Sequence, residues 1–308
     1  SDVYVSCKTM MPFNRNTITA LNILVYMMKA KTQKMNSKQK LASTLNLAYG
    51  TKVSYGLTSY GDLIQVDVRF QFVRPDWIED DSYVNKIKDI MDQVLYHSVL
   101  DEENFKESVY LLQNRLLAQM DDPANLSCMY AFEMAHEKHS ISIPVQGSLK
   151  DLNKLTYASF MTRLVNDVTD ENQNTYRILQ LLLNTLYVIS ETDIDMDFVL
   201  SVFELRLMVL LGFSPRLGKC NICSEKNNIG YFSMNHSGFL CNNCGKIDKS
   251  AIKISADTFN ALKYICTAPA KKIFSFSVSE ESRKELKLIS NLYLNKNLEK
   301  EYKFEKLF

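Results

Sequence analysis

The sequence predicts an α+β amino-terminal domain followed by a mostly α-helical domain that carries a four-cysteine zinc ribbon. The first half combines strand-like alternation with helical spacing, whereas the second half is rich in leucine at helical spacing. Four of the seven cysteines fall in two close pairs. A chain of 308 residues is long enough for two cores of ordinary size, so we expect two domains, residues 1–169 and 170–308.

The first domain is expected to open with a strand and two helices and then to form a β-hairpin. The hairpin strands alternate apolar and polar residues, and Tyr60-Gly61-Asp62 supplies the turn between them. Gly50 ends the second helix, because glycine most readily takes the left-handed capping conformation. Three more helices with polar faces and a short strand follow. The expected strands are 3–11, 52–58, 63–73 and 141–145, and the expected helices are 16–28, 37–48, 83–100, 102–120 and 125–137.

The second domain is expected to begin after the polar stretch 167–175, which contains few apolar residues and separates the two halves. Leucine-rich helices precede a ribbon at residues 219–246, and further helices follow it. The expected helices are 176–189, 197–211, 255–267 and 279–293.

The composition gives no global attraction to nucleic acid or to a membrane. The formal net charge is +1, so any binding of an anionic partner must come from a local basic patch. No apolar run is long enough to cross a bilayer, and the first residues do not resemble a secretory signal. We therefore expect a cytoplasmic protein without a membrane partner. The isolated Cys7, Cys128 and Cys266 stand among apolar neighbours and are expected to be ordinary reduced residues.

The two cysteine pairs have the spacing of a zinc ribbon. Cys220 and Cys223 are separated by two residues, as are Cys241 and Cys244, and 17 residues lie between the pairs. Two-residue spacing lets both sulfurs of a pair point at one ion. Redox-active thiol pairs are the alternative, but the context does not resemble thioredoxin. His236 lies between the pairs and is expected to be a loop residue, since four thiols already complete the ligand set.

Four thiolates fill the tetrahedral shell of one Zn²⁺ and leave no position for water or substrate. The predicted ion is therefore structural. Its apparent binding free energy, about 10 to 16 kcal/mol for such sites, is comparable to the stability of a whole domain. Removing zinc is expected to loosen this region.

The carboxy-terminal half resembles the RecO family of recombination mediators over about residues 171–308. The resemblance rests on the order of a helix carrying Phe203-Glu204-Leu205-Arg206-Leu207, the run from Leu210 to Pro215, and then Cys220. It implies help in loading recombinase and annealing strands, with single-stranded DNA, the tail of single-strand DNA-binding protein and RecR as partners. The OB barrel with which that family begins has no counterpart in this sequence, which bears on autonomous DNA binding.

Basic residues near the ribbon are the candidate nucleic-acid contacts, although scattered solvated charges explain them equally well. The candidates are Arg206, Arg216, Lys219, Lys246 and Lys249. The resemblance also makes Phe203, Leu207 and Phe213 conceivable partner contacts, whereas their helical spacing favours core packing.

The amino-terminal half resembles the pitrilysin/insulinase metallopeptidases, in particular non-catalytic members. The likeness lies in a strand, a helix, the segment from Lys40-Leu41-Ala42 to Leu47-Ala48-Tyr49-Gly50, and a strand pair. Active members carry His-x-x-Glu-His on the first helix. Asn22, Val25 and Tyr26 occupy the corresponding positions, and none of them can bind zinc or activate water as those residues do. A further ligand would come from the region of Glu107 or of Gln113-Asn114-Arg115.

Two functional hypotheses follow. The first is a non-enzymatic DNA repair and recombination mediator with a structural zinc, carried behind a catalytically inactive peptidase-like domain. The second is a non-catalytic subunit of an insulinase-type metallopeptidase that binds peptides or a catalytic partner. A chain without activity of its own is the third possibility.

Overall fold

The computed structural model describes residues 2–135, 139–169, 175–302 and 304, and its chain forms two compact units, residues 1–153 and 154–307. The α+β class of the first part and the helical class of the second are confirmed. The first unit contains β1 (Asp2–Pro12), α1 (Arg15–Met28), α2 (Lys38–Leu47), β2 (Lys52–Tyr60), β3 (Leu63–Val73), the 3-10 turn η1 (Pro75–Trp77), α3 (Tyr83–Tyr96), α4 (Glu102–Met120), α5 (Pro123–Ala135) and η2 (Ser140–Ser142).

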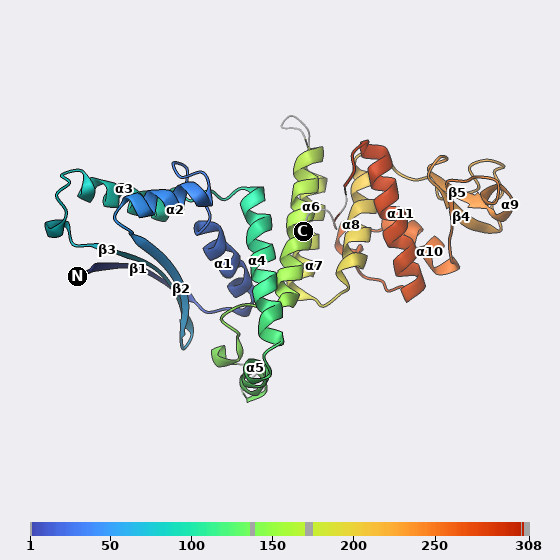
Figure 1. Ribbon diagram of the computed structural model, residues 1–308. Coiled ribbons are helices and arrows are strands. Elements are labelled where there is room, and N and C mark those ends of the chain that lie inside the picture. The colour runs from blue at the N-terminus through green and yellow to red at the C-terminus, as the bar shows by residue number, and fades with distance from the viewer. Residues whose placement is uncertain (1, 136–138, 170–174, 303, 305–308) are drawn as a thin grey trace. The chain divides into compact units, whose positions relative to one another are not determined.

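A three-stranded antiparallel sheet in the order β1-β3-β2 forms one layer of the first unit (Figure 1). The predicted hairpin is β2 and β3, and Gly61 in its turn has a φ of +57°. One face of the sheet packs against α2 and α3, where Val68 and Phe70 meet Ile87 and Val94. Gly50, with a φ of +72°, lies at the predicted end of the second helix.

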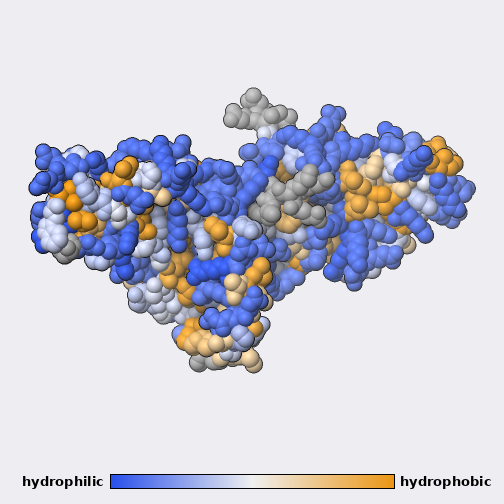
Figure 2. Space-filling view, in the orientation of Figure 1, coloured by the Kyte–Doolittle hydropathy of each residue, from blue (hydrophilic) through white to orange (hydrophobic). Residues whose placement is uncertain are grey.

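The helix α5 exposes large apolar side chains. Tyr130, Phe132 and Met134 are 54%, 52% and 83% exposed, and Figure 2 shows hydrophobic atoms gathered at this end of the first unit. The predicted helix 125–137 thus corresponds to α5, while residues 136–138 lie outside the described residues. The strand expected at 141–145 was wrong, because Ile143 and Val145 pack beside Phe13 and Ile18 without pairing to a strand.

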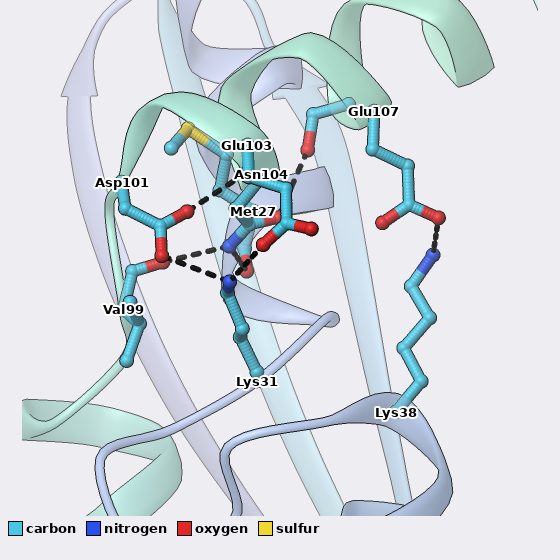
Figure 3. A network of polar contacts seen from close by, with 9 residues as sticks. Met27, Lys31, Lys38, Val99, Asp101, Glu103, Asn104 and Glu107 are labelled. Carbon is cyan, nitrogen blue, oxygen red and sulfur yellow. Dashed lines mark hydrogen bonds and ion pairs between the residues drawn. The ribbon is translucent and has the colours of Figure 1, made fainter.

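Polar side chains join α1 to the start of α4 (Figure 3). The Asn104 amide donates to the carbonyl oxygens of Met27 at 2.9 Å and Val99 at 2.7 Å. Lys31 lies 2.8 Å from Asp101 and 3.1 Å from Glu103. The Asp101 side chain also accepts from the Asn104 backbone N–H and so caps α4.

The second unit is mostly helical and carries a small three-stranded ribbon at one end (Figure 1). Its elements are α6 (Leu149–Val168, which begins at the end of the first unit), α7 (Tyr176–Glu191), α8 (Met196–Leu210), β4 (Ile229–Ser233), β5 (Gly238–Cys241), α9 (Asn242–Gly245), β6 (Ala251–Lys253), α10 (Ala256–Thr267), the 3-10 turn η3 (Ala270–Lys272) and α11 (Glu280–Leu298). The three strands form an antiparallel sheet in the order β5-β4-β6.

The helix α8 is the core of this unit. It is apolar on nearly all sides and packs against α7, α10 and α11. Phe203 and Leu207 are fully buried in it, as their spacing favours, whereas Phe213 beyond its end is 41% exposed. The helix α6 was not predicted, and its side chains from Tyr157 to Leu164 join the same core. The predicted division at residues 169 and 170 falls just after this helix, and residues 170–174 lie outside the described part of the chain.

Candidate metal centre

The first cysteine pair lies in a tight turn ahead of the ribbon strands. The Cys220 N–H donates to the carbonyl oxygen of Glu225 at 2.7 Å, and the Ser224 N–H donates to that of Cys220 at 2.9 Å. Ser224 takes a left-handed φ of +63° to close the turn. The Asn221 N–H donates to the carbonyl oxygen of Phe239 at 2.9 Å, so the turn is fixed to β5.

The second pair begins at the end of β5 and continues into the single-turn helix α9. Cys241 is the residue before α9, and Cys244 lies within it. The Asn242 N–H donates to the carbonyl oxygen of Asn228 at 2.9 Å, across the loop that enters β4. Both turns are thereby held to the same small sheet.

The two turns bring the four predicted ligands together. The sulfur atoms of Cys220, Cys223, Cys241 and Cys244 all lie within 4.8 Å of one another, and those of Cys223 and Cys241 are 3.6 Å apart. A tetrahedral site with Zn–S bonds of about 2.3 Å separates its sulfurs by roughly 3.8 Å. The cluster therefore has the size that one zinc ion needs. His236 is exposed and outside the cluster.

The electrostatics of the cluster also favour a cation. Burial opposes ionisation of the Cys220 thiol, but backbone N–H groups of Cys223, Cys241 and Ile222 outweigh it and lower its pKa to about 6. Burial and the neighbouring sulfurs raise the pKa of Cys244 to about 12. Four thiolates this close repel one another, so they need a bound dication to ionise together.

Two glycines allow the close approach of the ribbon segments. Gly238 has a φ of +156°, and a Cβ there would lie 2.2 Å from the backbone oxygen of Arg216. A Cβ on Gly245 would lie 2.3 Å from the Tyr231 ring. Neither position accepts a side chain without a shift of its neighbours.

Four of the five basic candidates lie on the surface of the ribbon. Arg216, Lys219, Lys246 and Lys249 are exposed, and none of them forms an ion pair with another residue that the structure describes. Residues 216–253 contain six basic and two acidic side chains, a formal +4 that a zinc ion with four thiolates reduces to +2. The ribbon thus carries a local positive charge on a nearly neutral chain.

Arg206 has a structural position instead. Its guanidinium donates to the carbonyl oxygens of Ile265, Cys266 and Ala268 at 3.1, 2.6 and 2.9 Å, where α10 ends. These bonds satisfy carbonyls that a helix end leaves unpaired. The Arg206 guanidinium is therefore occupied at the end of α10, and Arg206 is not among the phosphate contacts that we propose.

A buried carboxyl group that the pattern of the sequence did not single out lies between α8 and α11. Glu204 is 2% exposed, and its Oε2 accepts from the Ser290 hydroxyl at 2.6 Å, whereas Oε1 has no hydrogen-bond partner among the residues that the structure describes. It lines a cavity of about 350 Å³ with Asp197 and Lys287. A charged residue inside an apolar helical run is the only sequence signal for it.

The residues at the peptidase motif positions have structural contacts in α1. The Asn22 amide donates to the carbonyl oxygens of Ile18 at 2.9 Å and Val145 at 2.8 Å. Val25 is 5% exposed, and the Lys29 ammonium lies 5.2 Å from the centre of the Tyr26 ring. Glu107 is ion-paired with Lys38 of α2 (Figure 3).

Fold and site together define a helical domain that is packed around α8 and carries a four-thiol ribbon. Residues 149–305, half of the chain, match the family model described as "Recombination protein O C terminal". The chain belongs to this family. The match begins at the first residue of α6, earlier than the predicted residue 171, because α6 contributes to the core of the second unit.

The chain is similar to curated proteins called "DNA repair protein RecO". The one from Acetivibrio thermocellus is 44% identical over 153 residues, which cover 49% of this chain and 61% of the relative. The one from Thermoanaerobacter sp. (strain X514) is 32% identical over 154 residues, 50% of this chain and 62% of the relative. The chain thus spans about three fifths of the length of these relatives.

One solved structure overlaps weakly. A conserved protein from Enterococcus faecalis V583 has a TM-score of 0.47 and 16% identity, covering 49% of this chain and 37% of that one. The overlap is too low to define a shared fold. Among the described residues, no helix is long and apolar enough to cross a membrane.

Proposed function

We propose that the chain is a non-enzymatic DNA repair and recombination mediator whose ribbon, closed by one structural zinc, binds single-stranded DNA. The observation that carries this function is the four-thiol cluster inside a segment that matches the RecO carboxy-terminal family. A closed four-thiolate site leaves zinc no catalytic position, so the ion holds the ribbon in shape.

The exposed basic residues of the ribbon are the proposed phosphate contacts. Arg216, Lys219, Lys246 and Lys249 carry charge that no described partner neutralises. Lysine and arginine that meet phosphates release counterions, so affinity falls as salt rises. Single-strand DNA-binding protein tail and RecR are the protein partners that the family implies, and a cytoplasmic location suits four reduced thiols.

Metal analysis followed by a DNA titration tests this function. We expect about one zinc per chain, lost when Cys220 and Cys241 are changed to serine, and salt-sensitive binding of a labelled oligothymidine by the zinc-loaded protein. Changing Lys246 and Lys249 to glutamine should weaken binding and flatten its salt dependence. The matched control is the same change at Lys271 and Lys272, two exposed lysines of the same unit. Zinc without any DNA binding would contradict the proposed role.

The second proposal is the function that the resemblance of the first half implies, and the matched family segment, residues 149–305, does not extend over this unit. Its order of strand, two helices, hairpin and helices is the order that the peptidase resemblance implies, and the exposed apolar face of α5 suits a protein partner. In this alternative the unit binds extended peptides or a catalytic subunit without cleaving them. Fluorescence anisotropy with a labelled unstructured peptide tests it. Binding without cleavage is expected, and cleavage by the purified chain would contradict the structural roles of Asn22 and Val25.

A further inference from the structure

Two isoleucines at the cysteine turns are exposed, whereas the other aliphatic residues of the ribbon are buried or half-buried. Ile247 is 82% exposed and Ile222 is 49% exposed, whereas Leu240 and Ile254 of the same ribbon are 0% and 6% exposed. Neither exposed isoleucine belongs to a described hydrophobic cluster. Full burial of such a side chain stabilises a fold by about 1.5 to 3 kcal/mol, and these two side chains contribute only part of this, Ile247 the least.

Both isoleucines are held in place by the metal-binding turns. Ile222 stands between Cys220 and Cys223, and its backbone N–H donates to the Cys220 sulfur. The Ile247 N–H donates to the carbonyl oxygen of Cys244 at 3.2 Å. The backbone at each position therefore serves the cluster while the side chain faces outward. A β-branched side chain on a fixed backbone loses little rotamer freedom when a partner covers it.

Unpaired basic residues lie next to these isoleucines in the sequence. Lys219 precedes the first turn, and Lys246 and Lys249 flank Ile247. All three are exposed, without an ion pair among the described residues. Figure 2 shows hydrophobic atoms among hydrophilic ones at the ribbon end of the second unit. A single exposed isoleucine is ordinary on a protein surface, but here each cysteine turn has one within three residues of an unpaired lysine, inside the first pair and just after the second.

A partner for this surface must combine anionic groups with apolar faces. Single-stranded nucleic acid does so, because its phosphates are regularly spaced and its unpaired bases present their faces. Aliphatic side chains pack against and between bases in other nucleic-acid complexes. A membrane surface also combines the two features, but two short side chains on rigid turns offer little apolar depth for a lipid layer.

We infer that Ile222 and Ile247 form an apolar tip that packs against the bases of single-stranded DNA while Lys219, Lys246 and Lys249 contact its phosphates. This inference rests on the proposed function and specifies how the ribbon meets the strand. The apolar contact does not release counterions, so its contribution persists at high salt.

A salt titration of the full chain with an oligothymidine that carries 2-aminopurine distinguishes the apolar contact with the bases from the lysine contacts with the phosphates. The double variant Ile222→Ala and Ile247→Ala should bind about threefold to tenfold more weakly at every salt concentration, with an unchanged slope of log affinity against log salt. It should also lose the 2-aminopurine fluorescence change. Lys249→Ala should instead flatten the slope.

The matched control is Ile141→Ala, because Ile141 is 51% exposed and lies in the first unit. Zinc content reports whether each variant is folded, and Ile247→Phe should keep or strengthen binding. Salt-dependent binding that the double variant leaves intact would overturn the inference and retain the proposed function. Failure of the unaltered chain to bind DNA would overturn both. Isoleucine-dependent binding to phosphatidylglycerol vesicles, without a fluorescence change on DNA, would assign the tip to lipid and also overturn the inference.

Discussion

The carboxyl group of Glu204 makes the stability of the second unit depend on pH. Burial raises its pKa to about 7, against a smaller opposite effect of the Ser290 hydrogen bond. Asp197 adds to the rise and Lys287 opposes it. Because the folded state holds this proton more tightly than the unfolded state, the stabilisation is complete below the unfolded pKa of 4.5 and is lost as pH rises through about 7.

We expect Glu204→Gln to remove this pH dependence. The unaltered chain should lose on the order of 3 kcal/mol at most between about pH 5 and about pH 8, and the glutamine variant should lose correspondingly less. Urea unfolding followed by far-ultraviolet circular dichroism measures the difference. Glu281→Gln, at an exposed position of α11, is the control and should retain the dependence. Equal pH dependence in the unaltered chain and in Glu204→Gln would contradict this origin.

Arg206 should act on stability and leave DNA binding unchanged. Lysine cannot donate to three carbonyl oxygens in the way the guanidinium does. Arg206→Lys is expected to lower the stability of the second unit by about 2 kcal/mol, which thermal unfolding measures. The salt slope of DNA binding should equal that of the unaltered chain. A flatter salt slope in Arg206→Lys would indicate that Arg206 contacts DNA phosphates and would contradict this structural role.

At the scale of the elements, the ribbon depends on a close contact between α9 and β4. Gly245→Ala should force the Tyr231 ring to move, and overpacking of this kind costs about 1 to 3 kcal/mol. We expect zinc affinity to fall by about tenfold, measured by competition with a chromogenic chelator. Gly218→Ala is the matched control, because a Cβ there meets no atom within 4 Å. Equal affinities in the two variants would show that the contact is dispensable.

Most elements were predictable because their signals are local. The alternation in β3, the glycine turn at Gly61 and the glycine at position 50 after the second helix each act within a few residues. The cysteine spacing likewise predicted the clustered ligands, because two residues between the cysteines of a pair are enough to form the turn that points both sulfurs at one ion. A local signal is enough in these cases.

The remaining features depend on distant partners. Residues 141–145 have a strand-like pattern, but Ile143 and Val145 are held by side-chain packing on Phe13 and Ile18, so the segment forms a turn and a packed stretch without a ladder to any described strand. The helix α6 has little amphipathic pattern and is fixed by packing on α8. The role of Arg206 likewise depends on the end of α10, about 60 residues later, which no local pattern shows.

At the scale of the whole molecule, loss of zinc should affect one unit only. The ribbon packs into the helical core through Phe232 and Phe239, whereas the sheet of the first unit has its own core. We expect a strong chelator to speed hydrogen exchange in residues 216–253 and to leave β1, β2 and β3 unchanged. Mass spectrometry of peptides measures this exchange, and the protein reloaded with zinc is the control. Faster exchange in β3 would contradict independent cores.

The strand order of the first unit sets a sequence of events during synthesis. Asp2 pairs with Val73 and Pro12 with Leu63, so β1 leaves the ribosome before its partner β3 and must wait for it. Meanwhile β2 and β3 can close as a local hairpin, which forms quickly because its loop is short. Until β1 docks, β3 presents an open edge of the kind that recruits foreign strands. The interval between hairpin closure and docking of β1 is therefore a stage at which the nascent first unit is exposed to aggregation through the open edge of β3.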